Sequence, residues 1–342
     1  MKRGKKILSI VAIVIALLVI AYLLGPKPPV PVYDRTMPAV PADFTGLTNY
    51  IKTNEAKHKL KPDNEARIIW ANDSAKQKTD YAIVYIHGFS ASQEEGDPVH
   101  RNIAKEFGCN LYLARIGEHG IDTVDQMINL TADEYWNSAK EALAIGKQLG
   151  KKVILMSTST GGTVSLKLAA DYPNDVAALI LMSPNIAINN DKAWLLDTHW
   201  GLQIARAVTG SKYVDHQTTN KLEMQYWYEH YRLEAAVQLQ NLVSTSMTKE
   251  TFEKVKQPAQ LLYYYKNHVH QDSTVKVSAE LAMFDELGTP DSLKYKQAIP
   301  NARAHPIGSS ITSHDTKTVQ KAMEHFIGNT LGLKVARDVD YK

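Results

Sequence analysis

VILMSTSTGG, residues 153–162, joins a short apolar run to a cluster of small polar residues and two glycines. The apolar, β-branched start predicts a buried strand, and Thr163 to Tyr172 predicts a helix directly after it. A serine on such a strand-to-helix turn is typical of the G-x-S-x-G pattern, in which a strained backbone lifts the hydroxyl clear of the sheet. Ser159 is therefore a candidate nucleophile, although Ser157 stands where the pattern has its first glycine. The alternative is a polar strand–helix loop of the kind found in any α/β protein.

Strand-like and helix-like segments alternate on both sides of this stretch, from Tyr81 to Leu331. Thr131 to Glu134 is a capping box at the start of one of the helical segments. The expected strands are residues 66–70 (an edge strand), 81–88, 110–114, 153–156, 176–184, 259–265 and 292–299. The expected helices are residues 97–107, 132–149, 163–172, 276–287 and 316–331. This alternation predicts an α/β fold with a mostly parallel sheet flanked by helices on both faces.

Residues 185–255 break the alternation. They contain no convincing strand, much of the segment has a helical pattern, and aromatic residues are frequent in it. An insertion at this point predicts a helical cap over the carboxyl edge of the sheet, and most of its aromatic rings are expected to form the core of the cap. The predicted divisions are a first core part at residues 61–184, the cap at residues 185–255 and a second core part at residues 256–335.

Residues 1–24 combine four basic residues with an apolar run from Ile7 to Leu24. Eighteen helical residues span about 27 Å, near the lower limit for crossing a bilayer. No A-x-A-like cleavage site follows, so we expect an uncleaved signal-anchor in the inner membrane, crossing it once. The basic flank should stay cytoplasmic, which places the rest of the chain on the periplasmic, extracytoplasmic side. Cleavage of a signal peptide followed by secretion is the alternative.

Residues 25–60 form a proline-rich spacer followed by a lead-in of mixed character. Prolines at positions 26, 28, 29, 31, 38 and 41 predict a stiff, extended backbone. The whole chain of 342 residues is long enough for one large core with an insertion, and its net charge of +3 gives no case for nucleic-acid binding. The single cysteine, Cys109, excludes an intrachain disulfide and is expected to be buried.

A serine nucleophile needs an orienting acid, and in this kind of sheet the acid follows the serine along the chain. Asp272 is the one carboxylate in the loop after the predicted strand at residues 259–265, which makes it the candidate acid. Capping of the next helix is an alternative role for this residue. His268 and His270 alternate with Asp272, so a metal site is a second alternative, although no further ligand cluster accompanies them.

The base is expected last along the chain, and two backbone N–H groups are expected to bind the oxyanion. His305 lies in the loop after the last predicted strand and is the candidate base, with His314 as its competitor. The candidate oxyanion donors are the N–H of Thr160, next to the nucleophile, and the N–H of Phe89 in the loop after the first long strand. His87 in that loop suits a structural hydrogen bond.

The chain from about Tyr81 to Leu331 resembles the α/β-hydrolase family, and within it the capped carboxylesterase and monoacylglycerol-lipase-like branch. Besides the motifs above, residues 114–120 (ARIGEHG) are similar to an R-x-x-G-H-G segment of that family. The resemblance implies Ser159 as nucleophile, His305 as general base and acid, and Asp272 as orienter. It also implies a hydrophobic acyl pocket under the cap, no cofactor and no metal. The serine in place of the first glycine, and a longer and more polar loop before the acid, depart from the family pattern.

The expected reaction is hydrolysis of a carboxylic ester through an acyl-enzyme on Ser159. A small-molecule or lipid-like ester is the expected substrate, with the membrane as a partner through the N-terminal helix. Neither nucleic acid nor an obligate protein partner is expected. A serine peptidase or an acyltransferase would use the same residues, and both stay open as alternatives. A non-catalytic binding module with the same fold is the alternative from another class.

Overall fold

A seven-stranded sheet forms the centre of the molecule, with strand order β1-β3-β2-β4-β5-β8-β9. The computed structural model describes residues 2–336, with side chains from Lys5 onward. The strands are β1 (Arg67–Ile69), β2 (Thr79–Ile86), β3 (Asn110–Leu113), β4 (Gly150–Thr158), β5 (Ala178–Met182), β8 (Ala259–Tyr263) and β9 (Lys294–Ala298). β1 pairs antiparallel with β3 at the sheet edge, and the other neighbours are parallel. The predicted mostly parallel sheet and its edge strand are confirmed.

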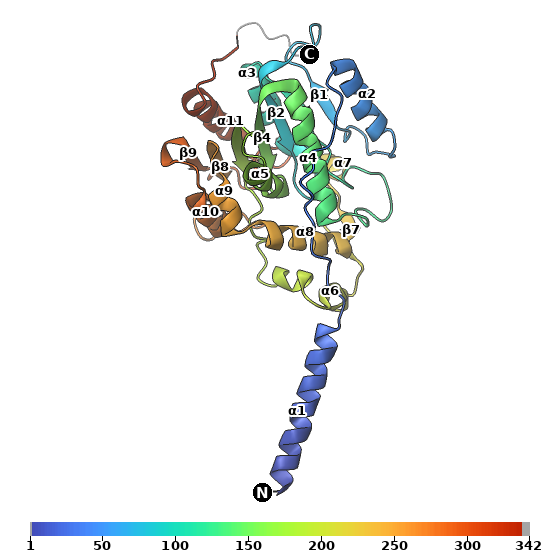
Figure 1. Cartoon of the computed structure of the whole chain (residues 1–342). Helices are drawn as coiled ribbons and strands as arrows, with labels where there is room; N and C mark the ends of the chain where they lie inside the picture. The colour runs from blue at the N-terminus through green and yellow to red at the C-terminus, as the bar shows by residue number, and fades with distance from the viewer. Residues whose placement is uncertain (1, 337–342) are drawn as a thin grey trace.

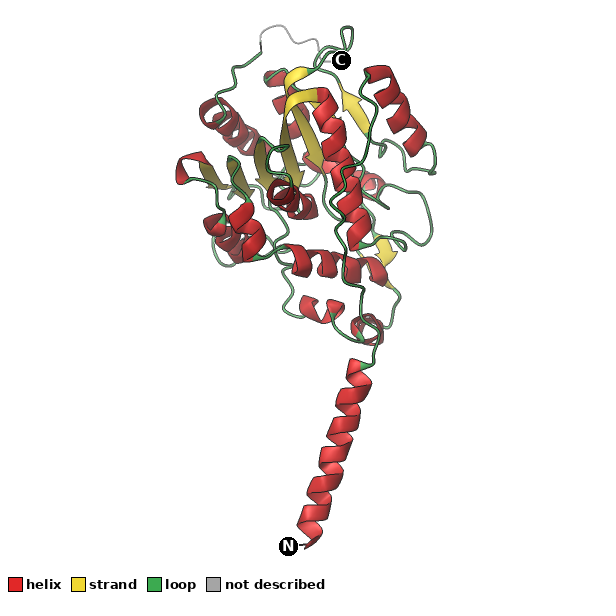
Figure 2. Cartoon of the chain, viewed as in Figure 1, coloured by secondary structure: helices red, strands yellow, loops and turns green. Residues whose placement is uncertain are grey.

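Helices cover both faces of this sheet (Figure 2). The elements around it are α2 (Phe44–Glu55), η1 (Gln93–Gly96), α3 (Val99–Glu106), α4 (Ala132–Leu149), α5 (Thr160–Asp171), α10 (Val277–Glu286), η3 (Asp291–Leu293), α11 (Thr316–His325) and the π-helical turn η4 (Phe326–Thr330). Successive side chains of a strand point to opposite faces. Val84 of β2 therefore packs in the cluster formed with α4 and α5, whereas Tyr85 packs in the cluster formed with α3 and α11.

The segment between β5 and β8 is mainly helical, as its sequence predicts. Its elements are η2 (Ala193–Asp197), α6 (Gly201–Thr209), β6 (Tyr213–Asp215), α7 (Lys221–Tyr226), β7 (His230–Arg232), α8 (Leu233–Ser246) and α9 (Lys249–Lys254). The expectation that it contains no strand is wrong, because β6 and β7 form a two-stranded antiparallel ribbon. Each strand has three residues, too few to show the alternating pattern by which a strand is recognised. The term cap is used below for the predicted range, residues 185–255.

The N-terminal helix α1 (Lys2–Leu23) projects from the body of the molecule (Figure 1). Among the described residues it is the one helix long and apolar enough to cross a membrane, over Lys5–Leu23. Its described side chains are exposed, so no protein surface covers its apolar surface. A helix of this kind is consistent with either a membrane anchor or a signal sequence.

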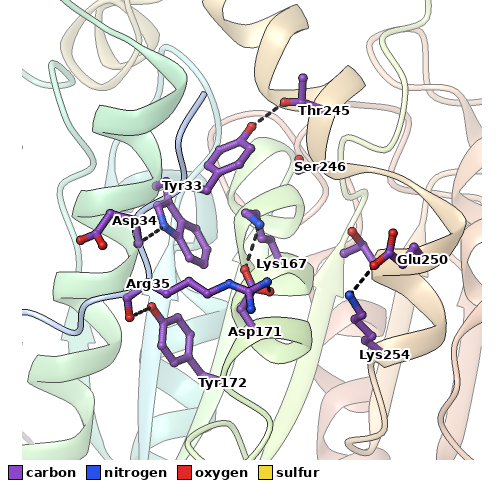
Figure 3. Close-up of polar contacts among 12 residues, drawn as sticks. Tyr33, Asp34, Arg35, Lys167, Asp171, Tyr172, Thr245, Ser246, Glu250 and Lys254 are labelled. Carbon is purple, nitrogen blue, oxygen red and sulfur yellow. Dashed lines mark hydrogen bonds and ion pairs between the residues drawn. The ribbon is translucent and has the colours of Figure 1, made fainter. Parts of the chain in front are cut away.

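Residues 26–41 follow α1 and form neither helix nor strand. We call them the docked segment, because they run along the domain and do not separate it from α1. Figure 3 shows the Tyr33 hydroxyl bonded to Thr245 of α8, at 2.6 Å, and the Arg35 guanidinium paired with Asp171 of α5, at 2.8 Å. The docked segment therefore ties the core helix α5 to α8 of the cap.

Candidate active site

The backbone turns sharply at Ser159, which lies between the last residue of β4 and the first residue of α5. Its φ of 53° and ψ of −123° fall in a region that non-glycine residues rarely adopt and that costs about 1–3 kcal/mol. Two hydrogen bonds hold the turn, from Ser159 N to Met182 O at 3.0 Å and from Asn185 N to Ser159 O at 2.8 Å. A Cβ at Gly161 would overlap the carbonyl oxygen of Ile86, which explains the need for glycine there.

Ser157 occupies the position of the first glycine in the elbow pattern. Its side chain is fully buried, and its Oγ has no hydrogen-bond partner among the described residues. A small side chain thus fits between strand and helix, but its hydroxyl loses the hydrogen bonds that it makes to water in the unfolded chain.

Asp272 and His305 form a buried pair, with 2.7 Å between Asp272 Oδ2 and His305 Nδ1. Oδ1 of Asp272 accepts two backbone hydrogen bonds, from Thr274 N at 2.8 Å and Val275 N at 3.1 Å. Burial acts to raise the pKa of Asp272, but the facing histidine and the two N–H groups outweigh it, so the pKa lies below its ordinary value. Asp272 therefore stays a carboxylate that can orient the imidazole and stabilise its protonated form.

The pKa of His305 is raised above its ordinary value. Burial alone would lower it, but the charge and hydrogen bond of Asp272, with a smaller effect of Glu95, favour the imidazolium more strongly. Glu95 is buried in η1 and accepts a short hydrogen bond from Gly88 N. Its own pKa is raised to about 7, chiefly by burial. Two carboxyl groups therefore act on the histidine.

Phe89 and Thr160, whose N–H groups are the candidate oxyanion donors, both line the same cavity. Neither N–H donates to another described residue. Thr160 is the first residue of α5, where the helix itself offers no acceptor. The loop that carries Phe89 approaches Ser159 closely, because a Cβ on Gly88 would lie 2.7 Å from Cβ of Ser159.

His87, next to these donors, has a structural role. Its Nε2 accepts a hydrogen bond from Ile116 N at 3.0 Å, so Nδ1 carries the proton and donates to Gly88 O at 2.8 Å. Burial lowers the pKa of His87 to about 4 and keeps the ring neutral. The competing base, His314, is exposed just before α11.

The alternative metal site does not assemble. His268 and His270 are exposed, whereas Asp272 is buried and bonded to His305. Within residues 2–336, no three His, Cys, Asp or Glu side chains are grouped as ligands of a metal ion would be.

A cavity of about 500 Å³ joins these groups, a size ordinary for small-molecule sites. Ser159 and His305 both line it, although no hydrogen bond links their side chains among the described contacts. The sheet side of the cavity contributes Phe89, Glu95, Ser159, Thr160 and His305. The cap side contributes Ala193, Leu196, Trp227, Tyr231 and Leu239, among others. Several cap aromatics therefore face the cavity or solvent, and Tyr228 is among those that are buried.

Sequence reasoning missed two carboxyl groups near the pair. Glu95 directly follows Glu94 in the loop after the first long strand. This pair of adjacent acidic residues was the available signal in the sequence. Glu280 of α10 is fully buried beside Asp272, and both of its oxygens lack a described hydrogen-bond partner. Burial and the negative charge of Asp272 hold the pKa of Glu280 well above its usual range. The helical pattern gave no sign of this burial.

Comparison with known proteins gives a family match and several similar structures. Residues 119–271 match the model of a family described as serine aminopeptidase, S33. One similar structure belongs to the metagenome-derived lipolytic enzymes LipS and LipT, with a TM-score of 0.63 and 15% identity over 79% of this chain and 99% of that one. Another is a soluble variant of monoglyceride lipase from Saccharomyces cerevisiae, with a TM-score of 0.56 and 14% identity over 78% and 91% of the two chains. A monoacylglycerol lipase from Paleococcus ferrophilus has a TM-score of 0.51 and 14% identity over 68% and 87%.

The comparison with curated protein sequences found no match. Identities this low show a shared fold. The family match covers a segment that contains the turn at Ser159 and the cap. The sheet is mostly parallel, and the strained turn at Ser159 lies at the carboxyl end of β4 in the middle of the sheet. On this evidence, the chain has the α/β-hydrolase fold.

Proposed function

We propose that the chain is a serine hydrolase that cleaves carboxylic esters of lipid-like molecules. The observation that carries the proposal is the buried Asp272–His305 pair, because His305 lines the same cavity as Ser159. A hydroxyl on a strained turn, a histidine held by a carboxylate and two unpaired N–H groups are the parts that acyl transfer requires.

In the acylation step, His305 Nε2 takes the proton of Ser159 Oγ as the oxygen attacks the ester carbonyl carbon. The Asp272 carboxylate holds Nδ1–H of the ring and stabilises the imidazolium that forms. The N–H groups of Phe89 and Thr160 donate to the carbonyl oxygen as it becomes negative. Such donors are each worth about a hundredfold or more in rate. His305 then protonates the leaving alcohol as the carbon–oxygen bond breaks.

In the deacylation step, a water molecule replaces the alcohol. His305 removes a proton from that water as its oxygen attacks the acyl carbon, and the same N–H groups hold the oxyanion. The proton returns to Ser159 when the acyl–serine bond breaks, which releases the carboxylic acid and restores the site.

An acyl-chain substrate is favoured by the cap wall, where Leu196, Tyr231 and Leu239 offer apolar surface to the cavity. The similar structures, of a lipolytic enzyme and two monoacylglycerol lipases, agree with this choice. We further propose that α1 remains attached and anchors the enzyme in the inner membrane, with the catalytic domain on the periplasmic side. Recovery of the intact N-terminus by mass spectrometry from alkali-washed membranes would support the anchor, and a mature chain that starts after Leu24 would replace it with secretion.

A fluorophosphonate probe tests the nucleophile directly, because it labels activated serines. We expect labelling of the wild type and of a Ser165→Ala control, and none of Ser159→Ala. Ser165 is a buried serine on α5, outside the cavity lining. An unlabelled but folded wild type would exclude a serine hydrolase and favour a binding module. A panel of p-nitrophenyl esters and monoacylglycerols would then define the acyl chain and the alcohol.

An aminopeptidase is the second candidate, and the family match over residues 119–271 favours it. The reaction would use the same serine, histidine and aspartate, with an amine as the leaving group. Aminoacyl p-nitroanilides separate the two candidates, because an esterase should turn them over far more slowly than p-nitrophenyl esters of similar size. Preferential cleavage of the anilides would establish the peptidase.

A further inference from the structure

The end of α1 is held by the part of the cap that precedes and begins α6. Trp200 N donates to Pro26 O at 2.7 Å, and Trp200 Nε1 donates to Ala21 O at 3.1 Å. Nδ1 of the neighbouring His199 lies 2.8 Å from Gly25 O. We call these contacts the clasp. They fix the cap within three residues of the end of the apolar helix.

The clasp depends on two residues with unusual requirements. Gly25 is buried, and a Cβ at this position would overlap the indole ring of Trp200. Trp200 itself has a φ of 64°, in the left-handed region that bulky residues rarely enter. Backbone strain of this kind persists where surrounding contacts hold it. The relative position of α1 and α6 is therefore set by packing and hydrogen bonds.

An apolar stripe lies beside the clasp on the outer surface of the cap. It consists of Trp194, Trp200, Ile204 and Val208, which are 59%, 39%, 40% and 80% exposed. The last three are spaced four residues apart, so they follow one side of α6. Large apolar side chains gathered on a surface in this way mark a site of contact with a partner or a membrane.

The stripe and the active-site cavity share a wall. Trp194 belongs to η2, and two other residues of that turn, Ala193 and Leu196, line the cavity together with Ser159. One short element thus presents apolar surface to solvent on one side and to the candidate substrate site on the other.

The direction of α1 places the stripe at the end of the membrane span. Figure 1 shows α6 directly beyond the end of α1, with the sheet and the other helices farther away. Tyr22 in the last turn of α1 packs edge-on against His199, with 5.4 Å between ring centroids. Tyrosine and tryptophan favour the boundary between lipid and water, and Trp200 bonds to the carbonyl oxygen of Ala21, the residue before Tyr22.

We propose that the apolar stripe lies in the lipid–water interface of the membrane that α1 crosses and holds the cavity wall against that membrane. The partner is the lipid bilayer itself. The inference rests on the anchoring and ester hydrolysis proposed above and extends them to the route of the substrate. An ester dissolved in the bilayer would reach Ser159 by moving sideways under the cap, without first crossing water.

The position of the stripe is tested with the full-length chain in phosphatidylcholine nanodiscs. Val208→Cys is labelled with the fluorophore NBD, and doxyl-labelled phosphatidylcholine serves as the quencher. Val335→Cys is the matched control, since Val335 is 59% exposed and its neighbour Ala336 bonds to Glu106 of α3, at the end of the molecule away from α1. The wild type, whose Cys109 is buried, gives the labelling background. We expect quenching at position 208 to exceed that at 335 severalfold, and equal quenching would overturn the proposal.

The consequence for catalysis is tested with Ile204→Asp/Val208→Asp, since neither residue lines the cavity. Turnover of a soluble p-nitrophenyl ester should stay within about twofold of wild type, while hydrolysis of a monoacylglycerol in the nanodisc should fall at least about tenfold. An unchanged rate on the bilayer ester would overturn the proposal. If position 208 is quenched but the chain hydrolyses neither ester, the contact of the apolar stripe with the membrane is supported and the proposed ester hydrolysis is wrong. The two claims can therefore be told apart.

Discussion

His305 Nδ1 lies 2.7 Å from Asp272 Oδ2, while the other oxygen of the same carboxylate accepts two backbone N–H groups. The carboxylate is thus fixed from both sides and in turn fixes the ring. With Nδ1–H donated to Asp272, Nε2 is left as the proton acceptor on the cavity side. The orientation of this one carboxylate therefore determines which ring nitrogen of His305 is left to accept a proton.

Asp272→Asn should lower kcat by about 10³–10⁴-fold, because the amide favours the wrong histidine tautomer and cannot stabilise the imidazolium. Folding should survive, since the asparagine oxygen can still accept from Thr274 N and Val275 N. Steady-state kinetics on a soluble ester, with circular dichroism as a check of folding, would measure both effects.

Glu280→Gln is the matched control, because Glu280 is the second carboxyl group buried beside Asp272 and lacks described hydrogen-bond partners. Its turnover should remain near that of wild type. If Asp272→Asn retains most of its turnover, the orienting role of Asp272 is wrong, and loss of activity in the double variant would transfer that role to Glu280.

Glu95→Gln should move the acidic limb of the pH–rate profile toward lower pH. The reaction needs neutral His305, so kcat/KM rises with pH through the pKa of that histidine in the free enzyme. Asp272 and Glu95 both raise this pKa, and removing one negative charge makes the imidazolium less favourable. Glutamine keeps an oxygen that can accept from Gly88 N, which protects the loop geometry. Profiles of kcat/KM across the neutral range would show the shift.

Glu94→Gln provides the control for that shift. Glu94 neighbours Glu95 in η1, but the charges that act on its pKa are Asp97, Arg101 and Asp63. Glu94→Gln should therefore leave the acidic limb of the pH–rate profile unchanged. A shift of equal size in both variants would mean that overall charge, and not the Glu95–His305 interaction, governs the profile.

The parts of the site that sequence analysis anticipated share one property: each lies where a predicted strand ends. Asp272 follows β8 and His305 follows β9, so the order of strands in the fold brings two residues 33 positions apart within hydrogen-bond distance. The docked segment could not be anticipated in this way. Its contacts pair Arg35 with Asp171, 136 positions away, and no repeating pattern accompanies them. The elbow at Ser159 is local in sequence, which is why its pattern was visible despite the missing glycine.

Ser157→Ala should raise the free energy of unfolding by about 1 kcal/mol, because it removes a buried hydroxyl that has no described partner. Ser138→Ala should instead lower the free energy of unfolding, since Ser138 Oγ accepts a hydrogen bond from Gly117 N at 3.1 Å. Urea unfolding of the detergent-solubilised chain, followed by tryptophan fluorescence, would compare the two. Destabilisation by Ser157→Ala would indicate that the hydroxyl has a partner, such as a bound water molecule, in solution.

Gly25→Ala should uncouple α1 from the cap, because the added methyl group overlaps the indole of Trp200 and the strained backbone there loses its support. We expect hydrolysis of a monoacylglycerol in nanodiscs to fall severalfold, soluble-ester turnover to stay unchanged, and protease cleavage after α1 to become faster. Gly328→Ala adds the same methyl group where nothing lies within 4 Å, so it should behave as wild type in all three assays. If the two variants cannot be distinguished, the clasp does not hold the cap at the membrane, and the apolar stripe alone must account for its position.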